Sequence, residues 1–376
     1  MTEKKSRARW VGLLGGVVGL VAAGAAAGIT LERYVVNRSR QLADDPYVDE
    51  PFGQLTAERG MTVRGEDDVD IFVEIIDPPD GEPDLTVIFV HGWCLDMGTF
   101  HFQRRYLPGM TDPRLRMIFY DQPGHGRSGR LAAGEYSLEA LGRTLHAVME
   151  AAAPTGPLVL VGHSMGGMAI MALAEEYPEL FGDRVVGVAL IATSAGGLEE
   201  VTLGLPDFFA RIRRPLMPLL TGASKLTPNM IDRARRVSSD LAWLLTRRYA
   251  FGGPQPSPSL VSYVERMNSS TSIEVVAGYL RTLFEHIRYE ALAALNGIEV
   301  VVVAGGADLL IPLAHSEEIC RLLPAAELVV IPEGGHMVLM EFAEEVNAHL
   351  AAFLKRAARS AAAINTDEER RTISDL

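Results

Sequence analysis

The sequence alternates short, almost uninterrupted apolar runs with segments of helical periodicity. The apolar runs cover residues 69–77, 85–92, 115–122, 158–164, 185–193, 299–306 and 327–335. Helical patterns fall between them, most clearly at 137–152, 165–177, 312–323 and 341–355. Strands that are apolar on both faces are typical of a parallel sheet covered by helices on both sides. This order of segments predicts a doubly wound, mostly parallel α/β sheet.

The alternation is interrupted once, between the run at 185–193 and the run at 299–306. The intervening residues are rich in Leu, Met and Phe and contain helical stretches but no strand pattern. We therefore expect a helical cap at 197–289, inserted after the strand that precedes it. The core would then consist of two parts, residues 61–196 and residues 290–357.

The N-terminus carries an uncharged stretch long enough to cross a membrane. Residues 10–31 contain no charged side chain, and four basic residues precede them within residues 1–9. A helix of that length can span the hydrocarbon core, and the preceding charges favour a cytoplasmic N-terminus. The sequence thus predicts a single-pass transmembrane anchor with the catalytic part outside the cytoplasm. The alternative is a signal peptide cleaved after an Ala-x-Ala pattern at Ala25 and Ala27, which would give a secreted protein.

Polar segments flank the expected core. Residues 32–60 are predicted to form a linker, and residues 358–376, which lack apolar periodicity, a disordered tail. The chain has 35 basic and 48 acidic side chains, and this net charge of −13 argues against a nucleic-acid partner. Cys94 and Cys320 match no metal-ligand or redox spacing, so no metal site is predicted.

Ser164 lies at the junction of an apolar run and a helical segment. The residues Gly162-His163-Ser164-Met165-Gly166 have the form G-x-S-x-G in a strand–turn–helix context. The two glycines leave room for a sharp turn, which would expose the serine hydroxyl at the carboxyl edge of the sheet. The sequence therefore predicts a nucleophile elbow at Gly162, His163 and Gly166, with Ser164 as the nucleophile.

A serine nucleophile requires a base, and a carboxylate that orients the base. Asp308 follows the run at 299–306, and His336 follows the run at 327–335. Both positions lie beyond the carboxyl ends of strands, at the same sheet edge as Ser164. The order Ser, Asp, His along the chain is the one expected for this scaffold, so we predict that these three residues form a catalytic triad.

Two main-chain N–H groups are candidates for an oxyanion hole. Met165 begins the helix after the serine, where an unpaired N–H and the helix dipole favour a negative charge. Trp93 lies in the loop after the run at 85–92 and would supply the second N–H. His91 and His125 are predicted to bond nearby backbone rather than to act as bases.

The segments VHGW, YDQPGHGRSG, GHSMGG, GADLLIP and EGGHMVLME, in this order, resemble the successive signatures of the α/β-hydrolase superfamily. The resemblance covers about residues 61–356 and includes a cap after strand 6 of that fold. Within this superfamily, the sequence is similar to the esterase- and lipase-like branch, including monoacylglycerol-lipase-like members. The resemblance implies an acyl-serine on Ser164 that water hydrolyses, with His336 as the base, and it requires no metal or organic cofactor.

The family hosts several reactions, so the residue at the elbow narrows the choice. A serine at position 164 argues against epoxide hydrolases and haloalkane dehalogenases, which carry aspartate there. An apolar cap and a membrane anchor favour lipid-like acyl esters. The expected function is a serine hydrolase of carboxylic esters, with a small apolar ester as substrate. The alternatives are a carbon–carbon bond hydrolase or a haloperoxidase-like esterase with the same triad, and a non-catalytic ligand-binding protein.

Overall fold

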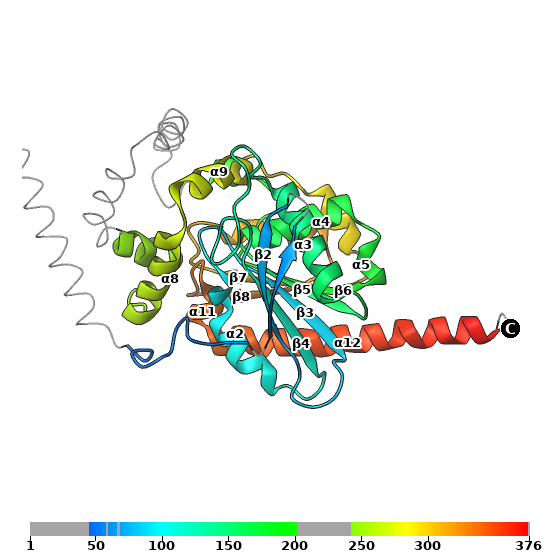
Figure 1. Ribbon diagram of the computed structural model, residues 1–376. Coiled ribbons are helices and arrows are strands. Elements are labelled where there is room, and N and C mark those ends of the chain that lie inside the picture. The colour runs from blue at the N-terminus through cyan, green and yellow to red at the C-terminus, as the bar shows by residue number, and fades with distance from the viewer. Residues whose placement is uncertain (1–44, 58, 66–67, 202–241, 375–376) are drawn as a thin grey trace, which may run out of the picture.

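The computed structural model describes residues 45–57, 59–65, 68–201 and 242–374 of the 376-residue chain (Figure 1). The predicted cytoplasmic N-terminus at 1–9 and the predicted anchor at 10–31 lie outside these residues. Among the helices of the described ranges, none combines the length and the apolar character needed to cross a membrane.

The described residues form an eight-stranded sheet in the order β1-β2-β4-β3-β5-β6-β7-β8. The strands are β1 (Arg59–Arg64), β2 (Asp70–Ile76), β3 (Leu85–Val90), β4 (Leu115–Tyr120), β5 (Leu158–His163), β6 (Val185–Ile191), β7 (Glu299–Gly305) and β8 (Glu327–Ile331). The strands from β4 to β8 in this order pair in parallel, whereas β2 is antiparallel to both of its neighbours. The prediction of a doubly wound, mostly parallel α/β sheet is therefore confirmed.

Burial explains why the central strands read as unbroken apolar runs. Every residue of β3, β5 and β6 is buried, because side chains that point to either face meet a layer of helices. One layer includes α3 (Leu138–Ala152), α4 (Met165–Glu176) and α10 (Leu313–Leu322). The other includes α2 (His101–Tyr106), α11 (Val338–Glu341) and α12 (Ala343–Ser374). Shorter elements are η1 (Met97–Phe100), η2 (Leu107–Gly109), α5 (Leu180–Asp183), η3 (Leu198–Glu200) and η5 (Glu290–Leu295).

The described residues between β6 and β7 are helical, as expected for the cap. Residues 242–250 form a helix, followed by α8 (Pro258–Ser270) and α9 (Ile273–Phe284). The hydroxyls of Ser257 and Ser272 accept hydrogen bonds from backbone N–H groups in the first turns of α8 and α9, which fixes where each helix begins. Residues 202–241 of the predicted cap lie outside the described ranges.

The predicted linker at 32–60 is partly an ordered element of the fold. We call residues 45–56 the strap. The carboxylate of Asp45 accepts hydrogen bonds from the hydroxyl of Ser257 at 2.5 Å and from the hydroxyl of Ser259 at 2.8 Å, at the start of α8. These contacts were not expected for a linker, because they are made to residues far along the chain and leave no local period in the sequence.

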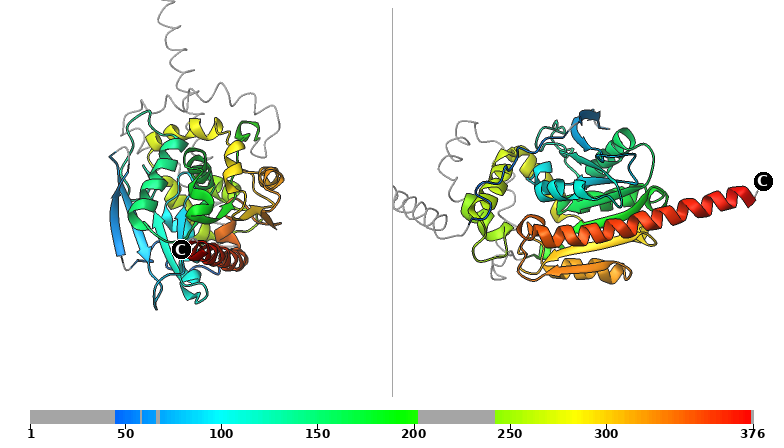
Figure 2. Two further views of the ribbon diagram at one scale, coloured as in Figure 1. Left: turned by 90° about the vertical axis from the view of Figure 1, so that its right-hand side faces the viewer. Right: turned by 90° about the horizontal axis from the view of Figure 1, so that it is seen from below.

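The C-terminal prediction also requires correction. The sequence predicted a disordered tail at 358–376, but α12 continues through Ser374. Figures 1 and 2 show the end of this helix extending well beyond the sheet. The segment is rich in Ala, Arg and Glu, which are strong helix formers, so local propensity favours a helix even where the apolar period has ended.

Candidate active site

Ser164 occupies a strained backbone position between β5 and α4. Its φ of 52° and ψ of −120° lie in a region that side chains rarely adopt. The Ser164 N–H donates to the carbonyl of Ile191 at 2.9 Å, and the hydroxyl of Thr193 donates to the Ser164 carbonyl at 2.7 Å. These bonds to the end of β6 hold the strained conformation in place, as expected of a functional turn.

Two glycines make room for this turn. A Cβ on Gly166 would lie 1.9 Å from the carbonyl oxygen of Val90, at the end of β3. A Cβ on Gly162 would lie 2.6 Å from the backbone nitrogen of Gly167, in the first turn of α4. Any side chain at either position would push the serine away from the strand or the helix that positions it.

The structure brings Ser164, His336 and Asp308 into one continuous hydrogen-bonded chain. The Nε2 atom of His336 is 3.0 Å from the Ser164 hydroxyl, and its Nδ1 atom is 2.8 Å from a carboxylate oxygen of Asp308. His336 lies in the loop after β8 and Asp308 in the loop after β7, both at the carboxyl edge of the sheet. In this geometry the imidazole can accept a proton from the serine hydroxyl while the carboxylate orients the ring.

Asp308 is held from its other side. Its side chain is fully buried, and its second carboxylate oxygen accepts the N–H groups of Leu310 at 2.8 Å and Ile311 at 3.0 Å. These two donors hold the carboxylate in place and leave its other oxygen free to accept a hydrogen bond from the His336 Nδ1–H. The imidazole is thereby kept with its Nε2 lone pair toward the serine.

The two predicted oxyanion donors have free N–H groups. Within the described parts of the chain, the main-chain N–H groups of Trp93 and Met165 donate no hydrogen bond. A Cβ on Gly92 would lie only 3.1 Å from the Cβ of Ser164, so the loop that carries Trp93 passes directly beside the nucleophile. Both donors are thus available near the serine.

Three other histidine rings near the elbow are buried and bonded to the backbone. His163 is 3.0 Å from the carbonyl of His336 through its Nε2, and burial lowers its pKa to about 3. The Nε2 of His91 accepts the Gln122 N–H, and burial lowers the pKa of His91 well below its usual value. Burial also lowers the pKa of His125 to about 4. These neutral rings are structural, as the sequence predicted for His91 and His125.

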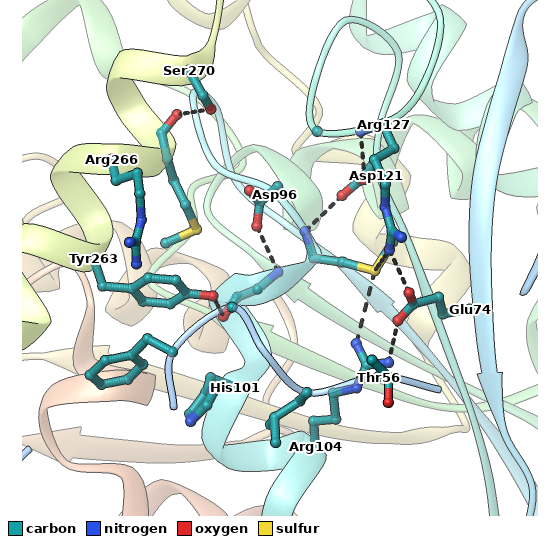
Figure 3. A pocket seen from close by; sticks show the side chains of 17 residues that line it. Thr56, Glu74, Asp96, His101, Arg104, Asp121, Arg127, Tyr263, Arg266 and Ser270 are labelled. Atoms are coloured by element: carbon teal, nitrogen blue, oxygen red, sulfur yellow. Dashed lines mark hydrogen bonds and ion pairs between the residues drawn. The ribbon is translucent and has the colours of Figure 1, made fainter. Parts of the chain in front are cut away.

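A cavity of about 560 Å³ lies between the strap, the loop after β3, α2 and α8 (Figure 3). No member of the predicted triad lines it. Three of its charged groups bind one another, since the carboxylate of Glu74 accepts hydrogen bonds from both Arg104 and Arg127. Asp96 and Asp121 also line it, and sequence reasoning did not single them out because their burial depends on segments distant in the chain. In the described ranges, no cluster of three His, Cys, Asp or Glu side chains could hold a metal ion.

The two aspartates of this cavity should make the stability of the protein depend on pH. Burial, and secondly the nearby Asp96 carboxylate, raise the pKa of Asp121 to about 6, and burial raises the pKa of Asp96. Because the folded state holds these protons more tightly than the unfolded chain, this stabilisation is complete below pH about 4 and is lost as the pH rises through about 6.

The variant Asp96→Asn tests this dependence. It keeps the side-chain oxygen that accepts the Gly98 N–H at 2.8 Å but removes a buried charge next to Asp121. We expect it to stabilise the protein at pH 7.5 by about 1 kcal/mol and to have less effect at pH 4.5. Thermal unfolding of both proteins at the two pH values measures the difference. An equal loss of stability at both values would contradict this account.

The chain was compared with protein families, curated proteins and solved structures. A family model described as the alpha/beta hydrolase fold matches residues 86–343. The acetyltransferase component of the acetoin cleaving system of Pseudomonas putida is 32% identical over 284 residues, which cover 73% of this chain and 65% of that protein. The chain thus spans less than two thirds of the length of that relative.

Two further relatives are esterases. The pimeloyl-[acyl-carrier protein] methyl ester esterase of Nitrosomonas europaea is 24% identical, over 70% of this chain and 92% of that protein. The structure of a thermophilic esterase from Thermogutta terrifontis superposes with a TM-score of 0.62 at 24% identity, over 80% of this chain and 99% of that one. The likeness to the solved structure shows the fold. From the family match and the sheet topology, we conclude that the chain belongs to the α/β-hydrolase fold family.

Proposed function

We propose that this protein is a serine hydrolase that cleaves carboxylic esters through an acyl-serine intermediate on Ser164. The observation that carries the proposal is the hydrogen-bonded chain from the Ser164 hydroxyl through His336 to Asp308, with distances of 3.0 and 2.8 Å. A buried histidine between a strained serine and a buried carboxylate is suited to accept the serine proton.

The reaction follows from this geometry. The Ser164 oxygen attacks the ester carbonyl while its proton passes to the Nε2 of His336. The negative charge that develops on the carbonyl oxygen is stabilised by the N–H groups of Trp93 and Met165. The intermediate collapses to the acyl-serine as His336 returns the proton to the departing alcohol. Water then repeats the sequence, with His336 again as base and then acid, and releases the carboxylic acid.

For the substrate, we propose esters with an apolar acyl group. The support is the similarity to a pimeloyl-[acyl-carrier protein] methyl ester esterase, and the abundance of Leu, Met and Phe in the sequence between β6 and β7. The same triad could also hydrolyse carbon–carbon bonds or support a haloperoxidase-like reaction, so substrate class has to be measured.

Two measurements test the proposal. A fluorophosphonate should label the protein covalently at Ser164, and peptide mass spectrometry locates the adduct. A panel of esters, thioesters and β-diketones that differ in acyl length should show the highest kcat/KM for esters. An adduct on another residue would refute the nucleophile, and preferential cleavage of diketones would identify a carbon–carbon bond hydrolase instead.

We also propose that residues 10–31 anchor the protein in a membrane with its catalytic part outside the cytoplasm; the support is the uncharged length of this segment and the basic residues before it. The full-length chain should sediment with membranes in high salt, whereas a chain that begins at Asp45, and so keeps the strap, should remain in the supernatant. Release of the full-length chain by salt alone would contradict a spanning helix. A mature N-terminus beyond Ala27 would instead identify a cleaved signal peptide.

A further inference from the structure

The backbone on either side of His336 is held by three different parts of the protein. We call residues 332–337 the base loop. The Gly335 N–H donates to the carboxylate of Glu341 at 2.9 Å, and the Met337 N–H donates to the carbonyl of Ala250 at 2.7 Å. The His336 carbonyl accepts from the Nε2 of His163 at 3.0 Å. The position of the imidazole therefore depends on contacts from outside its own loop.

Glu341 binds a second segment at the same time. We call residues 250–253 the cap turn, which starts at the last residue of the helix at 242–250 and precedes α8. The N–H of Gly253 donates to the Oε1 of Glu341 at 2.9 Å, and the N–H of Gly252 lies 3.1 Å from its Oε2. With the Gly335 N–H, three backbone donors from two segments converge on one carboxylate.

The two segments bound by Glu341 also touch each other directly. A Cβ on Gly252 would lie 2.3 Å from the carbonyl oxygen of Glu333, and a Cβ on Gly335 would lie 2.3 Å from the nitrogen of Gly252. Such an approach is possible only between glycines. The base loop and the cap turn thus form one joint, and the carboxylate of Glu341 is the charged group that binds both halves of it.

Contacts between the base loop and the cap turn matter for catalysis because the glycines of the base loop give its backbone high conformational freedom. Gly334 and Gly335 immediately precede His336, and glycine has more backbone conformational freedom than any other residue. Hydrogen bonds to a charged acceptor are stronger than those between neutral groups. A displacement of about 1 Å at a reacting group can cost about 100-fold in rate.

We propose that Glu341 is a positioning residue: by binding the cap turn to the base loop, its carboxylate holds His336 against the Ser164 hydroxyl. The inference rests on the proposed serine hydrolase function. It also assigns the cap a role in assembling the catalytic site, because the cap turn supplies two of the three N–H groups that orient the Glu341 carboxylate.

The test compares Glu341→Gln with a matched control. Glutamine keeps the volume of the side chain but replaces one acceptor oxygen with an NH₂ group, so at least one of the three N–H donors loses its acceptor. Glu345→Gln, on an exposed residue of α12, makes the same chemical change outside the joint. The readouts are kcat and KM for a p-nitrophenyl ester, with the concentration of folded sites taken from fluorophosphonate titration.

A positioning role predicts a specific pattern. In Glu341→Gln, kcat per titrated site should fall by about 10-fold to 100-fold while KM changes by less than about twofold, because ground-state binding does not use the base. Glu345→Gln should match the unmodified protein. A residue that only stabilised the fold would lower the titrated fraction and the unfolding temperature but leave kcat per site unchanged, and that result would overturn the proposal.

Gly252→Ala tests the same joint from the cap side. Its methyl group would press on the base loop while leaving the Glu341 carboxylate intact. It should lower kcat in the same way, and the double variant with Glu341→Gln should be no slower than the slower single variant, because both break one joint. Additive losses would overturn the proposal.

If Glu341→Gln does not fold, the proposal is tested by Gly252→Ala alone. An unchanged kcat per titrated site in that variant would overturn the proposal. Absence of any turnover in the unmodified protein would refute the proposed function itself.

Discussion

Replacing Ser164 with alanine should lower the rate of ester hydrolysis by at least about 10⁴-fold while the protein remains folded. The hydroxyl is the only group in the hydrogen-bonded chain that can form an acyl-enzyme, so its loss leaves only the oxyanion donors and substrate binding. The hydrogen bonds that hold the elbow join the N–H and carbonyl of Ser164 to Ile191 and Thr193. They do not involve the side-chain hydroxyl of Ser164. The fold should therefore tolerate the change.

The measurement is kcat/KM for a p-nitrophenyl ester together with the unfolding temperature. Ser269→Ala is the matched control, because this serine is exposed on α8 and its hydroxyl donates to the side chain of Glu265 in the preceding turn. It should retain full activity. Activity in Ser164→Ala within about tenfold of the unmodified protein would show that another group attacks the ester, and the proposed mechanism would be wrong.

Replacing Asp308 with asparagine should lower kcat by about 10⁴-fold, with little change in the fold. The asparagine oxygen can still accept the N–H groups of Leu310 and Ile311, which places the new NH₂ group against the Nδ1 of His336. The imidazole must then accept at Nδ1 and carry its proton on Nε2. In that tautomer it cannot take the proton of Ser164.

This prediction distinguishes an orienting carboxylate from a merely structural one. A pre-steady-state assay should locate the loss in acylation, and fluorophosphonate labelling should slow in parallel. Asp80→Asn, an exposed position outside the site, provides the matched control and should be fully active. A rate close to that of the unmodified protein would mean that His336 does not need Asp308 to act as base.

The central sheet could be predicted from the sequence because burial on both faces leaves unbroken apolar runs. The hairpin partner β1 could not, since five of its six residues are exposed or half-buried and the strand carries no apolar run. The proximity of Ser164, Asp308 and His336 could be predicted because each lies in the loop or turn at the carboxyl end of a parallel strand. The ordered structure of the strap could not be predicted, because it is stabilised by contacts with the start of α8, which is distant in the sequence.

The role proposed for Glu341 was equally inaccessible to sequence reasoning. Its carboxylate accepts hydrogen bonds from the backbone N–H groups of Gly252, Gly253 and Gly335. Every residue except proline has such a group, so the residue types do not reveal these bonds. The only sequence trace is glycine pairs at both ends of the joint, which by themselves are typical of ordinary turns.

The buried imidazoles around the elbow give the site a constant electrostatic background. The pKa of His125 is lowered to about 4 and that of His163 to about 3, and burial lowers the pKa of His91 as well. Neither His125 nor His163 gains a proton between pH 5 and pH 8. A loss of kcat/KM on acidification within that range would therefore have to come from groups other than these two rings.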